Sequence, residues 1–297
     1  MKKTLAMMTA AVMVAGALAG CGSSSSTPAA TTAAATEAAT TAAATDAATT
    51  EAAGDTAAAA EGTVKTPSGK FTVGFDQEFP PMGFVGDDGQ FTGFDLDLAK
   101  EVASRLGLEF VPQPINWDAK DMELDSGNID CIWNGFTMQG REDDYTWVGP
   151  YMANNQVFVV TADSDIASKA DLAGKAVEVQ KDSSGLAALQ GEAELSASFG
   201  SMTEVADYNT ALMDLESGAC DAVCMDSIVA GYQIKSSGKD MKILDDTLAA
   251  EEYGIGFKKG EDELAKAVYD TLMAMKDDGT VAKISNDWFG SDVFTLK

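Results

Sequence analysis

Residues 129–151 read IDCIWNGFTMQGREDDYTWVGPY. The stretch opens with five apolar, β-prone residues, Ile129 to Trp133, which are followed by the turn formers Asn134 and Gly135. A short apolar run bounded by turn formers predicts a buried strand rather than a helix. We therefore expect a strand that ends at the Asn134-Gly135 pair.

Polar side chains follow this strand. Thr137 supplies a hydroxyl, and Arg141 supplies a guanidinium a few residues later. Ligands of open α/β sheets bind just outside the carboxyl ends of the strands, and a guanidinium can hold a carboxylate through two parallel hydrogen bonds. Arg141 is therefore a candidate carboxylate-binding residue. The alternative is a surface arginine that pairs with the acidic residues 142–144.

The composition excludes several function classes. The chain has 297 residues, a formal net charge of −27 and no histidine. Such a negative charge argues against nucleic acid as a partner, because phosphates are repelled. Without histidine, histidine-dependent triads and histidine-ligated zinc are excluded as well.

The N-terminus has the pattern of a lipoprotein signal peptide over residues 1–20. Lys2 and Lys3 precede an apolar segment that is too short and too rich in alanine for a membrane span, and the segment ends in Leu-Ala-Gly before Cys21. This ending resembles a bacterial lipobox, which implies cleavage before Cys21 and acylation of its thiol. We therefore expect a membrane-anchored protein on the extracytoplasmic face of the cell membrane.

Residues 21–62 then form an Ala/Thr/Ser-rich segment without large apolar side chains. Such a composition cannot bury enough apolar surface to offset the entropy of ordering, so a disordered linker is expected. Three further cysteines, Cys131, Cys220 and Cys224, lie in the remaining chain. Cys220 and Cys224 would stand about 13 Å apart on one extended strand, which is too far for a disulfide. Free buried thiols are the favoured state.

An internal repeat indicates two similar α/β lobes. Residues 122–130, MELDSGNID, are echoed by residues 213–221, MDLESGACD. Each copy has the pattern of a helix end, a Ser-Gly cap and an aspartate before an apolar strand. The first strand leads to Arg141 and the second to Asp226, so lobes that face each other would bring an arginine and a carboxylate to one cleft. An α-amino acid carries the two opposite charges.

A second anion site is indicated in the later lobe. The apolar strand that ends at Val179 gives way to Ser183-Ser184-Gly185 and then to a helical pattern. The free backbone N–H groups at such a helix start attract anions, although a serine before a helix is more often only an N-cap.

With these pieces placed, the chain from about Thr63 to Gly290 resembles the family 3 extracellular solute-binding proteins of ABC importers, which take polar amino acids. The resemblance rests on separated motifs, among them GFDQEFPPMGF at 74–84, WDA at 117–119, GFTMQGRED at 135–143 and YGIGFKKG at 253–260. It implies a periplasmic-binding-protein-like α/β fold of two lobes with two crossover hinge segments. The expected organisation is lobe 1 over 63–154 and 253–297, and lobe 2 over 155–252.

The resemblance also implies site residues. The family's carboxylate-binding arginine falls on Arg141, and its lobe 2 donors fall on Ser183 and Ser184. Its amine-binding aspartate falls on Asp226. The full set of ligand-binding candidates is Asp76, Phe79, Trp117, Asn134, Gly135, Thr137, Arg141, Ser183, Ser184 and Asp226. Phe79 and Trp117 would enclose the ligand's aliphatic part, and Asp76 would reach its side chain.

Three residues depart from the family's pattern. Asp182 stands where glycine is usual, which puts an acid near the carboxylate site. Trp133 is uncommon, and core packing is favoured for it over a role in binding. Glu78 has two interpretations that the sequence leaves open, a solvent-facing charge or a partner of Asp76 in favouring a cationic side chain.

The implied function is a monomeric receptor that captures a free amino acid and delivers it to the membrane permease of an ABC importer, without cofactor, metal or catalysis. The competing hypothesis is an enzyme on the same scaffold, similar to a cyclohexadienyl dehydratase, for which Glu78 is the one obvious general acid. A sensory domain is a third hypothesis. It would need a transmembrane helix and further domains beyond Lys297.

Overall fold

The computed structural model describes residue 66 and residues 68–297. The signal peptide, the lipidation site Cys21 and the linker predicted for 21–62 lie outside the described residues. Among the described helices, none combines the length and the apolar character that crossing a bilayer requires.

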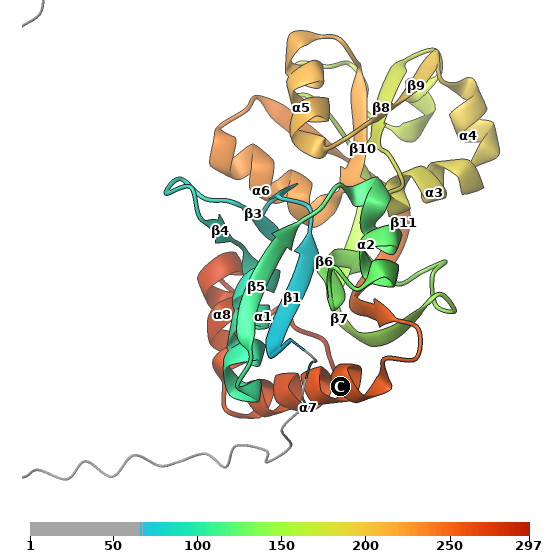
Figure 1. The fold of residues 1–297 in the computed structure, drawn as a ribbon. Helices are drawn as coiled ribbons and strands as arrows, with labels where there is room; N and C mark the ends of the chain where they lie inside the picture. Colours follow the sequence, from blue (N-terminus) through green and yellow to red (C-terminus); the bar gives the residue numbers. More distant parts are fainter. Residues whose placement is uncertain (1–65, 67) are drawn as a thin grey trace, which may run out of the picture. The chain divides into compact units, whose positions relative to one another are not determined.

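An eight-stranded mixed sheet forms the centre of the fold, in the order β5-β1-β6-β11-β7-β10-β8-β9 (Figure 1). Its strands are β1 Lys70–Phe75, β5 Glu109–Pro114, β6 Cys131–Thr137, β7 Tyr145–Thr161, β8 Ala176–Gln180, β9 Ser201–Val205, β10 Ala222–Asp226 and β11 Met241–Lys258. A small antiparallel sheet contains β2 Glu78–Phe79, β3 Gly83–Val85 and β4 Phe91–Thr92.

Each half of this sheet has its own set of helices. The α-helices are α1 Phe94–Leu106, α2 Lys120–Ser126, α3 Ser184–Gly191, α4 Ala193–Ser198, α5 Tyr208–Ser217, α6 Ser227–Ser237, α7 Asp262–Asp277 and α8 Thr280–Phe289. Two short 3-10 helices, η1 Trp117–Ala119 and η2 Lys169–Leu172, lie in connecting segments. Helices α1 and α2 contact β1 and β6, α7 contacts β7 and α1, and α8 packs on α1 and α7. Helices α3, α5 and α6 contact the half that contains β8 and β10.

The chain therefore forms two α/β lobes that share two long strands. β1 pairs in parallel with β5 and β6 in lobe 1, and β8 pairs in parallel with β9 and β10 in lobe 2. β7 and β11 lie between these groups and pair with each other in antiparallel, with register shifts at Thr247 and near Gly254. These two strands are the only crossovers of the described chain between the lobes. The exact lobe boundaries at 154 and 252 stay predictions.

The sequence repeat is confirmed as two matching corners. Gly127 caps the end of α2 and Gly218 caps the end of α5, both with a left-handed backbone, at φ 74° and 77°. In each copy the aspartate that follows accepts a backbone hydrogen bond from the neighbouring strand. Asp130 accepts from the N–H of Thr72 at 2.6 Å, and Asp221 accepts from the N–H of Ala176 at 2.8 Å. The repeated aspartate thus ties each corner to its own sheet.

The expected end of the strand at Asn134-Gly135 is wrong. β6 begins at Cys131 and continues through these two residues to Thr137, because Phe136 and Thr137 pair with Gly254 and Tyr253 of β11. Pairing between strands overrides the local turn preference. Gly135 remains distorted, at φ 55°, inside the strand.

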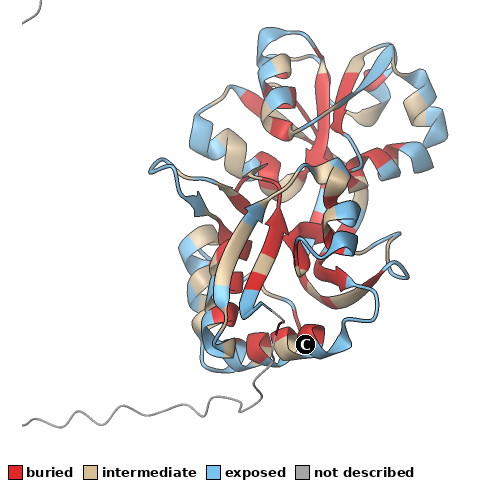
Figure 2. Cartoon of the chain, in the orientation of Figure 1, coloured by how far each residue is buried: buried red, intermediate tan, exposed pale blue. Residues whose placement is uncertain are grey.

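The inner strands of both lobes are largely buried, whereas the edge strands β5 and β9 have no buried residue (Figure 2). All seven residues of β6 are buried, and so are all five of β10. Trp133 is fully buried with its ring centroid 6.4 Å from that of Tyr151, so its predicted role in core packing is confirmed. Cys131, Cys220 and Cys224 are buried and free.

Candidate functional site

The carboxyl ends of four strands meet where the two lobes face each other. In lobe 1, Asp76 follows β1 and Thr137 ends β6, whereas in lobe 2, Ser183 lies in the loop after β8 and Asp226 ends β10. Ligands of α/β sheets bind at this edge because the loops and helix starts there are free to face a ligand. A hydrogen bond of 3.1 Å from the Thr137 hydroxyl to the Ser184 hydroxyl joins the two sides.

A narrow cavity at this edge brings together eight of the ten predicted residues. Its lining residues are Phe79, Trp117, Gly135, Thr137, Arg141, Gln180, Ser183, Ser184 and Asp226. The cavity volume is about 10 Å³, which is roughly the space of a single water molecule. The lobes must therefore separate before an amino acid can enter.

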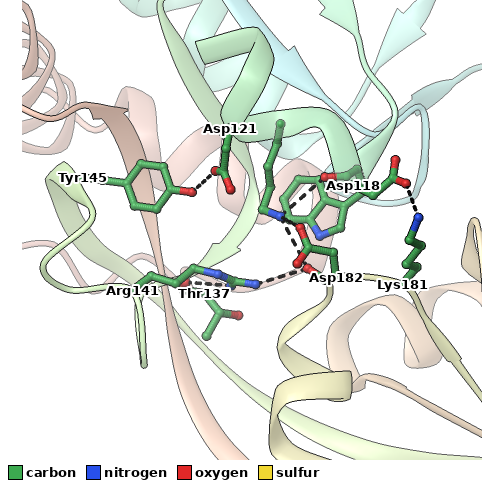
Figure 3. Close-up of polar contacts among 9 residues, drawn as sticks. Asp118, Asp121, Thr137, Arg141, Tyr145, Lys181 and Asp182 are labelled. Atoms are coloured by element: carbon green, nitrogen blue, oxygen red, sulfur yellow. Dashed lines mark hydrogen bonds and ion pairs between the residues drawn. The ribbon is translucent and has the colours of Figure 1, made fainter. Parts of the chain in front are cut away.

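Arg141 supplies the positive end of this cavity. Its guanidinium donates to the carbonyl oxygen of Thr137 at 3.2 Å and to that of Asp182 at 3.3 Å (Figure 3). Its Cζ lies 5.1 Å from the ring centroid of Phe136. The ion pairs among the described residues include none with Arg141. The alternative of a surface arginine paired with residues 142–144 is therefore wrong.

The start of α3 faces the same cavity from lobe 2. Ser183 is the N-cap residue, and its hydroxyl accepts from the N–H of Leu186 at 3.1 Å. This bond occupies the Ser183 hydroxyl as a helix cap. Ser184, at the first helical position, accepts from the Thr137 hydroxyl and from the Gln156 amide at 3.2 Å. Positive charge density at a helix N-terminus suits a carboxylate.

Asp226 supplies the negative end. It is 3% exposed and accepts hydrogen bonds from Asn154 at 2.7 Å, Tyr253 at 2.7 Å and Tyr208 at 3.1 Å. Burial, and then the nearby carboxylate of Glu251, raise the pKa of Asp226. Each cause disfavours an ionised Asp226 that has no counter-ion. A bound ammonium group would supply that counter-ion.

Gly135 permits the close approach of an aromatic ring. A Cβ at this position would lie 2.9 Å from Phe79 and 3.1 Å from Tyr253, so a side chain cannot be added without moving a ring. Its N–H donates to the carboxylate of Asp95 at 2.7 Å. The ammonium group of a ligand donates hydrogen bonds. The carbonyl oxygen is the backbone group of Gly135 that can accept one.

The two predicted residues that do not line the narrow cavity lie behind it and beside it. Asn134 is buried, and its side-chain oxygen accepts from the N–H of Asp76 at 3.0 Å. Asp76 is 6% exposed and accepts from the Gln180 amide at 2.7 Å. Burial raises the pKa of Asp76 to about 6. Asn134 thus holds the loop that carries Asp76.

Asp76 borders a second, larger cavity of about 810 Å³, which shares Trp117 with the narrow one. The larger cavity is lined by six acidic side chains and one basic side chain. These are Asp76, Glu78, Asp118, Glu123, Glu204, Asp207 and Lys181. The narrow cavity therefore borders a negatively charged space.

Sequence reasoning missed several polar residues around the cavity. Gln180 lines it, and Asn154, Gln156 and Tyr208 hold Asp226 or Ser184. Gln180 ends β8 and Asn154 and Gln156 lie on β7, so each is a polar residue in a mostly apolar strand. Such isolated polar residues are a signal that the sequence alone contains. No group of three or more potential metal ligands occurs in the described part of the chain.

The chain is similar in sequence to a known protein family and to individual proteins within it. The sequence profile of the bacterial extracellular solute-binding proteins, family 3, matches residues 71–291. The L-cystine-binding protein TcyJ of Escherichia coli is 31% identical over 231 residues, which cover 76% of this chain and 84% of that protein.

Solved structures agree with that match. The substrate-binding protein of an ABC uptake transporter from Streptococcus pneumoniae, solved with bound histidine, is 34% identical with a TM-score of 0.74, and the match covers 77% of this chain and 96% of the other. An ancestral arginine-binding protein bound to arginine is 36% identical with a TM-score of 0.70, over 75% and 99% of the two chains.

Proposed function

The chain belongs to the bacterial extracellular solute-binding proteins, family 3, and we propose that it captures a free amino acid between its lobes and delivers it to the permease of an ABC importer. Similar proteins are named for cystine, histidine and arginine. The receptor acts as a monomer tethered by lipid at Cys21. Its binding site consists of the ten residues predicted from the sequence, among which Asn134 positions Asp76, joined by Gln180.

One observation carries this proposal. The guanidinium of Arg141, which has no carboxylate partner among the described residues, and the buried carboxylate of Asp226 line the same cavity. An α-carboxylate and an α-ammonium group satisfy both at once, and neither lobe alone supplies both charges. Such a ligand binds the closed form better than the open form, which is the condition for ligand-driven closure.

The direct test is calorimetry of the purified body, residues 62–297, against the common amino acids and cystine, together with solution scattering. We expect one or a few amino acids to bind and the radius of gyration to fall on saturation. Analogues of the ligand that lack the α-carboxylate or the α-ammonium group should fail to bind. If no amino acid binds, or if binding leaves the scattering curve unchanged, the receptor hypothesis is wrong.

The negatively charged outer cavity favours a ligand with a cationic side chain, and this leads to a pH prediction. Asp76 has a pKa of about 6, so at pH 5 only about a tenth of it is ionised. We expect the affinity for arginine, relative to that for glutamine, to fall about tenfold between pH 7.5 and pH 5. Titration of Asp226 affects both ligands alike and cancels in the ratio.

The control for this prediction is Asp76→Asn. In that variant the ratio of the two affinities should be lower at pH 7.5 and nearly independent of pH. A ratio that changes with pH equally in the variant and in the natural protein would assign the effect to another group. A constant ratio in both would remove the preference for a cationic side chain.

The proposed anchor is testable in a bacterial host. The Cys21→Ser variant cannot be acylated at sulfur, so the protein should move from the membrane fraction to the soluble extracytoplasmic fraction. Ligand affinity of the purified variant should be unchanged. A Cys21→Ser protein that stays in the membrane fraction would contradict the lipid anchor.

The enzyme hypothesis is less well supported, because Glu78 does not line the narrow cavity. Its carboxylate accepts from the Asn209 amide across the lobes, and the residue lines the outer cavity instead. A general acid must lie within hydrogen-bond distance of the substrate atom that receives its proton. Turnover of a prephenate-like substrate, lost in Glu78→Gln, would reverse this ranking.

A further inference from the structure

Two ion pairs of opposite polarity cross between the lobes at the mouth of the cavity. Lobe 1 supplies Asp118 and Lys120 from η1 and the start of α2, and lobe 2 supplies Lys181 and Asp182 from the loop after β8. Asp118 pairs with Lys181 at 2.7 Å (Figure 3). Lys120 pairs with Asp182. The two pairs differ in burial, so breaking one is expected to affect the protein differently from breaking the other.

Lys120 is a buried ammonium group. Its side chain is 2% exposed, whereas that of Asp182 is 51% exposed. Its other contacts are the carbonyl oxygens of Trp117 and Asp182, both at 3.5 Å, and the face of the Trp117 ring, whose centroid lies 5.2 Å from Nζ. Carbonyl contacts this long compensate poorly for burying a charge. The Asp182 carboxylate is therefore the main compensation for Lys120.

Asp182 adopts an unfavourable backbone conformation to reach this position. It is the only non-glycine residue with a positive φ in the described chain, at 57°. Side chains other than glycine lose free energy in this left-handed region, although aspartate and asparagine tolerate it better than most. The same conformation points the Asp182 carbonyl oxygen at the guanidinium of Arg141, 3.3 Å away. One residue of lobe 2 thus contacts two cations of lobe 1, the ammonium group of Lys120 and the guanidinium of Arg141.

We propose that Lys120 and Asp182 form a clasp between the lobes that holds Trp117 and Arg141 in their binding positions and favours closure before any ligand arrives. The proposal rests on the proposed function only for its ligand readout, since the clasp also acts on the empty protein. A ligand that binds the closed form gains affinity in proportion to the closed fraction. The clasp therefore sets affinity without touching the ligand.

The test compares Asp182→Asn, Lys120→Met and the double variant. Asparagine keeps the left-handed backbone but removes the charge, so closure must bury Lys120 without a carboxylate. We expect the dissociation constant to rise about tenfold or more, because removing one partner of a buried pair leaves the other uncompensated. Lys120→Met leaves only an exposed Asp182, so a rise of roughly threefold is expected. The double variant should match Lys120→Met rather than the sum of the two.

The alternative role for Lys120 is direct binding of the ligand carboxylate, and it predicts the reverse order. Asp182→Asn would then release Lys120 and improve affinity, and Lys120→Met would be the most damaging change. That outcome would overturn the clasp. The matched control is the exposed neighbouring pair, with side chains 56% and 39% exposed. Because both residues also line the outer cavity, their control readout is the radius of gyration of the empty protein, which Lys181→Met and Asp118→Asn should leave unchanged.

Scattering without ligand tests the clasp independently of binding. The empty Asp182→Asn protein should have a larger radius of gyration than the empty natural protein, whereas empty Lys181→Met should not. Equal radii for all three would overturn the clasp, even if amino acids bind as proposed. If instead the radii differ as expected and no amino acid binds, the clasp stands and the proposed function fails.

Discussion

Replacing Arg141 with alanine is expected to weaken amino-acid binding by about 30-fold to several-thousand-fold, equivalent to roughly 2–5 kcal/mol. The guanidinium has no carboxylate partner among the described residues, so its removal leaves no protein charge unpaired. The loss falls on the bound state, in which the ligand carboxylate must be enclosed without a counter-ion. Calorimetry at pH 7.5 measures it directly.

Two controls sharpen this result. Arg141→Lys keeps the positive charge but loses the planar pair of donors, so its affinity should lie between those of the natural protein and the alanine variant. Arg105, the other arginine of the chain, pairs with Glu101 and Asp278 on the outside of lobe 1, and Arg105→Ala should bind normally. Binding within threefold of normal in Arg141→Ala would remove Arg141 from the site.

Much of the fold could be predicted because its signals are local. The helix cap Ser-Gly followed by aspartate recurs in the two lobes, and the structure places Gly127 and Gly218 in nearly the same backbone conformation. The end of β6 could not be predicted in this way. Asn134 and Gly135 are turn formers by themselves, and only pairing with β11, distant in sequence, keeps them in a strand.

The site shows the same division. Charged residues at strand ends, such as Arg141 and Asp226, could be found because their chemistry matches the two ends of an amino acid. Lys120 could not, because nothing near it in sequence indicates that its ammonium group is buried. Its partner Asp182 lies in the other lobe, 62 residues away in the chain. Contacts of this kind arise only when the two lobes are placed together.

The second large effect concerns Asp226→Asn, which should lower the affinity for the ligand and raise the stability of the empty protein. Its pKa is raised above the unfolded value of 3.8, first by burial and then by Glu251. The folded protein therefore holds this proton more tightly than the unfolded chain does. It follows that the free energy of unfolding falls as the pH rises above 3.8, and that the full penalty is present above the raised pKa.

Glu251 provides the matched control. Its carboxylate accepts from Asn154 at 2.6 Å and from Gln156 at 2.9 Å, and it is 5% exposed beside Asp226. Glu251→Gln removes the repulsion but leaves the Asp226 carboxylate for the ligand ammonium. This variant should melt at a higher temperature than the natural protein at pH 8 and should still bind.

Asp226→Asn removes the same repulsion, so at pH 8 the empty protein should also be more stable, by on the order of 1 kcal/mol or about 2–4 °C in melting temperature. The amide oxygen can still accept from Tyr253 or Tyr208, which lie 2.7 and 3.1 Å from the carboxylate. The ligand ammonium, however, loses its counter-ion in a closed cavity, and affinity should fall about a hundredfold or more. Melting curves with and without ligand separate the two effects, since ligand should raise the melting temperature of Glu251→Gln but barely that of Asp226→Asn. An Asp226→Asn protein that is less stable when empty, or that ligand stabilises normally, would show that this carboxylate serves the fold rather than the ligand.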